Sequence, residues 1–72
     1  MPGLLGEFGK RVRQLRRAEG WSQEQLAEKS GLHTNYVGGI ERGERNLSLL
    51  NIGRLAKAFR ISASELLKGV GR

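Results

Sequence analysis

The side chains of this chain that could carry chemistry are mostly cationic. Thirteen Lys and Arg stand against seven Glu, which gives a formal net charge of +6 and a pI near 10.9. Cys is absent and His33 is the one histidine, so a metal site is not expected. No Ser/His/Asp or Cys/His set is available, and the glutamates suggest no paired acid–base site. We therefore predict no enzymatic activity and no cofactor.

A charge of this size on a small body favours polyanions, meaning nucleic acid or an anionic membrane face, although a well-hydrated surface would also account for it. No uncharged run approaches the length of about 20 residues that crosses a bilayer. The first residues show no basic stretch followed by a long apolar one, as a signal peptide would. These features predict a cytoplasmic protein with no membrane partner.

One stretch has the spacing of two short helices joined by a tight turn. Counted from position 23, Ala27 is the fifth residue, Gly31 the ninth, Val37 the fifteenth and Ile40 the eighteenth. A helix-turn-helix needs a small residue where its helices cross, a glycine with positive φ in the turn, and inward apolar side chains. The four matches together predict this motif at about residues 23–42.

The elements that must position this motif are all helical. Alternating strand patterns and hairpin turns are absent from the sequence. Ser22 and Ser62 open capping boxes, each with Gln or Glu three residues later, and glycines end the helical patterns at positions 20, 31, 43 and 69. We predict an all-α fold in a single domain of residues 1–72, with helices at residues 5–19, 23–30 and 34–42, after Ser48 and after Ser62.

Several runs of residues resemble a known family. They are Ser22-Gln23-Glu24-Gln25-Leu26-Ala27, Gly31-Leu32, Tyr36-Val37, Ile40-Glu41-Arg42-Gly43, Leu55-Ala56-Lys57-Ala58-Phe59 and Ser64-Glu65-Leu66-Leu67. With these runs the chain resembles the Xre/Cro-type helix-turn-helix family. Residues 31–36 and 40–49 most resemble the controller proteins of restriction–modification systems, which are small dimeric regulators of their own operon.

The resemblance implies a compact, five-helix, lambda-repressor-like DNA-binding domain whose third helix lies in the major groove of double-stranded DNA. The residues facing DNA would be Thr34, Asn35, Tyr36, Gly38 and Gly39. Asn35 would bond an adenine edge and Thr34 would meet a thymine, unless both simply form a polar helix start. Tyr36 would give its hydroxyl to a phosphate, or be a half-buried aromatic with a solvated tip.

The same resemblance implies phosphate contacts around this helix. Gln23 would donate from the start of the second helix, and Arg42, Arg45 and Asn46 would hold the backbone on the far side. In some relatives an arginine at this place reaches a base instead, and solvated surface charge is a further alternative for each arginine. Residues 22–43 carry a net charge of −1, so attraction to phosphate must come from flanks of +3 and +4.

Two features depart from the family pattern, the glycine pair at positions 38 and 39 and the histidine at position 33. Gly38 and Gly39 fall inside the third helix, where each costs about 0.5–1 kcal/mol relative to Ala and removes a side chain that could read bases. They would permit close backbone approach to DNA, leave specificity to the neighbouring residues, or simply be tolerated. His33 stands where Ser commonly caps the helix and is expected to be a weak cap.

Glu41 is an acid near the DNA face, and the resemblance suggests a structural ion pair with Arg16.

We predict a homodimer for two reasons. One short helix reads few base pairs, whereas two copies read half-sites about 10 bp apart. A chain this small is also only marginally stable alone, and its later segments hold more apolar residues than one core needs. The interface is expected around Ile52, Phe59, Ile61, Leu66 and Leu67. No small-molecule ligand is expected.

The leading hypothesis is therefore an autoregulatory, sequence-specific regulator acting on a two-fold operator. A phage-type repressor shares most of these residues. A second class, an antitoxin or protein-interaction adaptor with the same fold, is favoured by the glycine pair, which thins the base-reading surface. A basic helix at a membrane surface would fit the first segment but leaves the helix-turn-helix spacing unexplained.

Overall fold

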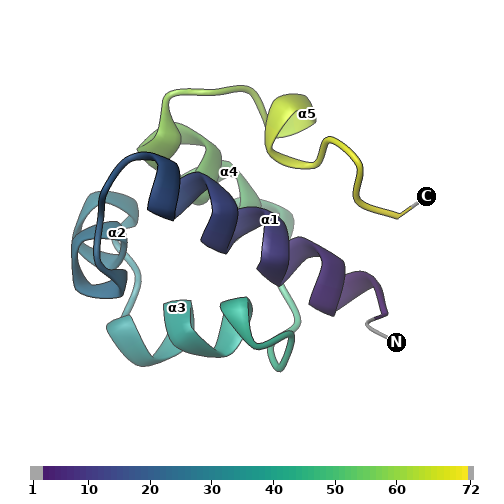
Figure 1. Cartoon of the computed structure of the whole chain (residues 1–72), viewed down its shortest axis with the longest axis horizontal. Helices are drawn as coiled ribbons and strands as arrows, with labels where there is room; N and C mark the ends of the chain where they lie inside the picture. Colours follow the sequence, from purple (N-terminus) through teal and green to yellow (C-terminus); the bar gives the residue numbers. More distant parts are fainter. Residues whose placement is uncertain (1–2, 72) are drawn as a thin grey trace.

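The structure, a computed structural model, describes residues 3–71, and within that range it contains five helices and no strand (Figure 1). The helices are α1 (Leu4–Ala18), α2 (Gln23–Ser30), α3 (Thr34–Glu41), α4 (Leu49–Phe59) and α5 (Ala63–Leu66). The predicted all-α, five-helix fold class is confirmed. The predicted bounds of α2 agree with the structure, those of α1 differ by one residue at each end, and those of α3 differ by one residue at the C-terminal end.

Serine side chains begin three of the helices. The Ser22 hydroxyl accepts from the Gln25 backbone N–H at 3.1 Å, and the Gln25 side chain accepts from the Ser22 N–H at 2.7 Å, which completes the predicted capping box. The Ser48 and Ser62 hydroxyls likewise accept from the backbone N–H three residues later, at the starts of α4 and α5. Only half of the second predicted box forms, because the Glu65 carboxylate accepts from Arg11 of α1 at 3.1 Å instead.

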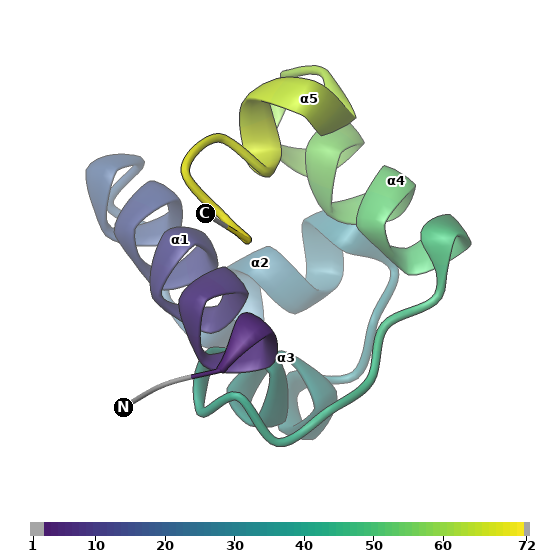
Figure 2. The same cartoon turned by 90° about the vertical axis from the view of Figure 1, so that its right-hand side faces the viewer.

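The helices surround one apolar core (Figures 1 and 2). Figure 2 shows α1, α3, α4 and α5 around it, with α2 behind. Each helix gives the core the side chains on its inner face. The buried apolar residues are Phe8, Val12, Leu26, Ala27, Val37, Ile40, Leu55, Ala56, Phe59 and Leu66.

Close contact between α1 and α3 depends on Gly9. A Cβ atom at Gly9 would lie 2.7 Å from the backbone oxygen of Glu41, too close for any side chain. The glycine therefore lets the two backbones approach, which sets α1 directly against the back of α3. This contact fixes the orientation of α3 relative to the rest of the molecule.

A second cluster joins the start of α2 to the end of α4. The rings of Trp21 and Phe59 stack with centroids 5.5 Å apart and planes 13° apart. The Lys29 ammonium lies 4.9 Å from the centroid of the Trp21 ring, in a cation–π contact. Trp21 is half-buried, as expected for a residue that belongs to the core rather than to a binding surface.

The C-terminal segment folds back onto α1. Arg11 donates to the backbone oxygens of Leu66 at 3.2 Å and Glu65 at 2.7 Å, and the Glu7 carboxylate accepts from the Gly71 N–H at 2.9 Å. Figure 2 shows this segment beside the start of α1. Across residues 3–71, every helix is too short or too polar to cross a bilayer.

Candidate nucleic-acid interface

The turn between α2 and α3 is built on Gly31. Its φ of 73° and ψ of 24° lie in the left-handed region, which glycine enters without steric cost. The next N–H, that of Leu32, donates to the Ala27 carbonyl at 3.0 Å and closes the end of α2. Ala27 lies at the crossing of the two helices and is 3% exposed, and Val37 on the inner side of α3 is fully buried. The turn and the crossing therefore hold α3 rigidly against α2.

The first residues of α3 point into solvent. Thr34 and Asn35 are both exposed. His33 occupies the N-cap in an extended conformation, with φ of −75° and ψ of 145°, and its side chain makes no capping hydrogen bond within residues 3–71. The start of α3 thus presents two short polar side chains together with backbone N–H groups that the cap residue does not satisfy.

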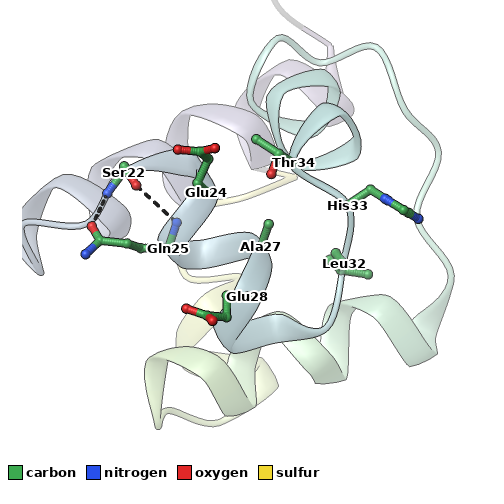
Figure 3. Close-up of a pocket in the computed structure, with 8 residues that line it drawn as sticks. All are labelled: Ser22, Glu24, Gln25, Ala27, Glu28, Leu32, His33 and Thr34. Carbon is green, nitrogen blue, oxygen red and sulfur yellow. Dashed lines mark hydrogen bonds between the residues drawn. The ribbon is translucent and has the colours of Figure 1, made fainter.

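A shallow depression of about 650 Å³ lies between α2 and the start of α3 (Figure 3). Its lining includes Glu24 and Glu28, which follow one another by one turn of α2, and Thr34 at its α3 end. Carboxylates and phosphates are both negatively charged and repel one another, so Glu24 and Glu28 disfavour DNA backbone along this side of α2. The depression therefore marks an edge of the candidate interface.

Tyr36 is anchored to the scaffold on both sides of its hydroxyl. The hydroxyl donates to the Asn46 carbonyl at 3.1 Å and accepts from the Asn51 side-chain amide at 3.2 Å. A phenol has one proton to donate, and here the Asn46 carbonyl takes it. In the chain without DNA the Tyr36 hydroxyl thus ties α3 to the loop before α4, and the phosphate contact expected of Tyr36 stays a prediction.

Asn51 is a residue that the sequence did not single out. Its amide oxygen accepts from Arg54 at 3.2 Å while its nitrogen holds Tyr36, so it links α4 to α3. The available signal was the one uncharged polar residue in a largely apolar helix, but its partner is 15 residues away in the chain.

Gly38 and Gly39 are not bare backbone facing outward. Both are buried, because arginine side chains from beyond the helix lie over them. A Cβ atom at Gly38 would lie 3.1 Å from Arg42 Nη1, and one at Gly39 would lie 2.8 Å from Arg45 Cγ and from Arg45 Nε. In the chain without DNA the arginine side chains thus occupy the space over these glycines, and close backbone approach to DNA stays a prediction.

The polar residues after α3 are exposed. Arg42, Arg45 and Asn46 all reach solvent, and Arg42 Nε donates to the Glu44 carboxylate at 3.1 Å. These side chains, with Thr34 and Asn35, make up what we call the α3 face. Two arginines thus lie at the C-terminal end of α3, and Thr34 and Asn35 lie at its N-terminal end.

Behind this face, the Glu41 carboxylate is fully buried and binds Arg16 through two hydrogen bonds. The Nε–Oε2 distance is 2.6 Å and the Nη2–Oε1 distance is 3.0 Å. Arg16 Nη1 also donates to the Trp21 carbonyl at 2.8 Å. Burial alone would raise the pKa of Glu41, but hydrogen bonds from Arg16 and Gln23 and the Arg16 charge outweigh it and lower the pKa. The bond to Glu41 raises the pKa of Arg16.

Two further donors share this carboxylate. Gln23 Nε2 donates to Glu41 Oε1 at 3.1 Å, and Arg13 Nε approaches the same oxygen at 3.4 Å. Gln23 is thus partly committed inside the protein, although an amide nitrogen carries a second N–H. The sequence did not single out Arg13 in this role. The available signal was its position three residues before Arg16, which places both side chains on one face of the helix.

The five residues expected at a dimer interface divide into two groups. Phe59 is 8% exposed and Leu66 is 0% exposed, so both belong to the core of this chain and have little or no surface for a partner. Their assignment to an interface is wrong, because Phe59 of α4 stacks on Trp21 and the short α5 turns Leu66 into the core. Ile52, Ile61 and Leu67 are half-buried. The exposed apolar side chains of α4 are instead Leu49 and Leu50, at 80% and 65%.

The chain matches a family model described as Helix-turn-helix over residues 12–66. It is 50% identical over 60 residues to the control protein C.SmaI of Serratia marcescens, covering 83% of this chain and 71% of that protein. It is 46% identical over 61 residues to the control protein C.BamHI of Bacillus amyloliquefaciens, covering 83% and 75%.

Among solved structures, the chain is similar to the restriction-modification controller protein C.AhdI from Aeromonas hydrophila. The TM-score is 0.84 and the sequence identity is 58%, over 86% of this chain and 94% of that one. The likeness therefore extends to sequence as well as fold and includes nearly the whole of the solved chain.

Proposed function

The chain belongs to the helix-turn-helix family and is a transcription regulator of the restriction–modification controller type, and from this premise we propose that it binds a two-fold operator as a homodimer and regulates its own operon. The proposal concerns the assembly, the DNA site and the residues that contact it.

The observation that carries the proposal is the composition of the α3 face. Thr34 and Asn35 are exposed at the start of a helix held by Gly31 and by the core. Asn can bond an adenine edge at two points, and the Thr methyl can contact a thymine. We assign base reading to these two side chains.

Phosphate contacts are assigned to side chains around the reading helix. Arg45 and Asn46 are exposed beyond its C-terminal end, and Gln23 lies at the start of α2 with one amide N–H to donate. A helix N-terminus favours an anion, which supports Gln23 in this role. These contacts would orient the helix without reading sequence.

The homodimer is supported by the exposed surface of α4. Leu49 and Leu50 lie beside Gly53, Arg54 and Lys57 around an apolar hollow of about 540 Å³. A two-fold axis would place this surface against its own copy and bury the leucines. We therefore move the proposed interface to the N-terminal half of α4, with half-buried Ile52 at its margin.

The adaptor alternative loses the feature that favoured it. It rested on the idea that Gly38 and Gly39 thin the base-reading surface, but Arg42 and Arg45 cover those positions. The surface is therefore cationic at the end of α3, which supports DNA binding rather than docking of a protein by apolar contact.

The test is binding to the DNA upstream of the chain's own coding sequence, followed by mobility shift over a salt series. We expect tight binding to a two-fold repeat that weakens steeply with salt, by a slope of about −0.9 per phosphate contact on a log–log plot. Asn35→Ala should lose discrimination between sequences, and Arg45→Ala should weaken binding to all of them. Equal affinity for random DNA would contradict the proposal.

A further inference from the structure

Another depression, of about 380 Å³, lies between the C-terminal ends of α1, α2 and α4. None of its lining residues belongs to the α3 face. Figures 1 and 2 show α3 at the bottom of the molecule and the C-terminal end of α4 above the core. Its size is near the lower end of ligand pockets, about 300–1,000 Å³. The lining includes Glu19, Trp21, Lys29, Lys57, Phe59 and Arg60.

The inner side of this depression is a rigid aromatic stack. Trp21 and Phe59 have ring centroids 5.5 Å apart, and the Lys29 ammonium lies 4.9 Å from the centroid of the indole ring. Because both neighbours lie over the indole, a nucleic-acid base finds little ring surface on which to stack. Half-buried Ala58 adds a small apolar side chain to the lining. The depression therefore does not suit a stacked base.

Three cations surround the stack. Lys29 lies in the last turn of α2, Lys57 in the last turn of α4, and Arg60 directly after α4. All three are exposed, and the ion pairs within residues 3–71 involve other side chains. Glu19 is the one acid of the lining, so three positive charges and one negative charge give the depression a formal charge of +2. It therefore attracts anions.

Arg60 is the cation whose presence the fold does not explain. The helix dipole favours a cation in a last turn, which accounts for Lys29 and Lys57. Arg60 has φ of 59° and ψ of 40°, and every other residue with positive φ within residues 3–71 is a glycine. A Cβ in the left-handed region costs free energy that glycine avoids. Backbone strain of this kind is concentrated at functional sites, which indicates a binding role for the Arg60 side chain.

The spacing of the cations indicates what kind of anion they suit. Lys29, Lys57 and Arg60 come from α2, from α4 and from the turn after α4, so their charges are spread around the depression. A single small anion meets few of them at once, whereas carboxylates along a peptide can pair with all three. A peptide also brings apolar side chains for contact with Ala58 and the edges of the aromatic rings, which the phosphate backbone of DNA does not.

We propose that this depression binds an acidic segment of a partner protein, whose carboxylates pair with Lys29, Lys57 and Arg60. Because the lining shares no residue with the α3 face, the regulator can hold this partner and DNA at the same time. The inference goes beyond the proposed function and does not require that function to be correct.

The probe is a short synthetic peptide of Glu and Leu without aromatic residues, and the control peptide has Gln in place of Glu. Fluorescence of the full chain follows binding, because the one tryptophan lies in the lining. The test variants are Lys29→Gln and Arg60→Gly. Lys57 is left unchanged, because it also lines the hollow beside Leu50 where the dimer interface is proposed.

The matched controls are Arg17→Gln on α1 and Lys68→Gln after α5, each of which removes one positive charge from an exposed position outside the depression. Arg60→Gly also separates binding from folding. It removes the charge together with the strained Cβ, so the midpoint of thermal unfolding should not fall. A variant that is no less stable and yet binds the peptide more weakly has not lost binding through damage to the fold.

The acidic peptide should change the Trp21 emission saturably, and the Gln peptide should not. Lys29→Gln and Arg60→Gly should each raise the Kd by roughly threefold, the size expected for one exposed ion pair, while the two controls leave it unchanged. Equal weakening in all four variants would overturn the inference, because it indicates attraction to the overall charge. Absence of a saturable change would overturn it too, and so would complete displacement of the peptide by a DNA duplex.

Discussion

At the scale of single residues, the Glu41 carboxylate links three parts of the helix-turn-helix scaffold. It accepts from Arg16 and Arg13 of α1 and from Gln23 of α2, while its own backbone lies at the end of α3. Its side chain is 0% exposed, whereas that of Arg16 is 12% exposed. Because these donors come from two other helices, the Glu41 carboxylate holds α3 in place against α1 and α2.

Glu41→Gln should lower the free energy of unfolding by about 3 kcal/mol, because Arg16 is then left partly buried without a counter-charge. Urea unfolding at neutral pH measures this. The matched control is Glu44→Gln, whose pair with Arg42 is exposed on both sides and should cost less than about 1 kcal/mol. Equal losses in the two variants would contradict the structural role of Glu41.

The lowered pKa of Glu41 also predicts a dependence of stability on pH. Its contribution is complete above the pKa of an unfolded glutamate, about 4.3. It is lost as the pH falls from there through the lower folded-state pKa. Unfolding free energies measured below pH 5 should therefore fall less steeply in Glu41→Gln than in wild type, and parallel curves would show that Glu41 is not responsible.

At the scale of helices, local signals in the sequence predicted where elements begin and end. Ser22 with Gln25 predicted the start of α2, and the glycines after the helices have φ values of 73–82°. Caps and left-handed turns depend on a few neighbouring residues, so one stretch of sequence contains the whole cause. Arg60 ends α4 in the left-handed region without being glycine, and no such signal predicted it.

Contacts across the chain were predicted less well. The arginines over Gly38 and Gly39 and the bond from Tyr36 to Asn51 depend on how loops fold over α3. The inward position of Leu66 depends on how α5 packs. Apolar residues on a short helix indicate burial, but they do not show whether the core or a partner provides it. The site was therefore predicted as a set of residues, while its geometry required the structure.

Two substitutions at helix ends should act in opposite directions. Gly31→Ala should lose about 1 kcal/mol of stability, because a Cβ in the left-handed region is strained even where no neighbour is touched. Arg60→Gly should gain a smaller amount, since the added freedom of the unfolded chain offsets part of the relief. Thermal unfolding of the two variants measures both signs, and a loss in Arg60→Gly would show that the Arg60 side chain stabilises the end of α4.

At the scale of the whole molecule, the residues assigned to DNA and the most exposed leucines of α4 lie on different elements. The α3 face carries exposed arginines at its end, while the largest exposed apolar side chains of α4 are Leu49 and Leu50. A small domain with a limited core gains stability from a second copy, and its apparent stability then depends on concentration. DNA binding and self-association would therefore use separate surfaces of one compact body.

Leu50→Glu should convert the proposed dimer to a monomer, because a carboxylate cannot be buried in an apolar interface without a partner. Sedimentation equilibrium measures the mass, and binding to a two-fold site should weaken with it. Ala18→Glu, which adds the same charge at an exposed position of α1, is the control and should leave the mass unchanged. A dimer that persists in Leu50→Glu would place the interface elsewhere.

The stack of Trp21 on Phe59 has a practical consequence. Trp21 is the one tryptophan of the chain, and its ring contacts Phe59 and Lys29, neither of which is assigned to DNA. Unfolding exposes the indole to water and shifts its fluorescence to longer wavelength. The protein therefore carries an intrinsic optical probe of folding that lies away from the α3 face, so the stability of variants altered on that face can be compared without a label.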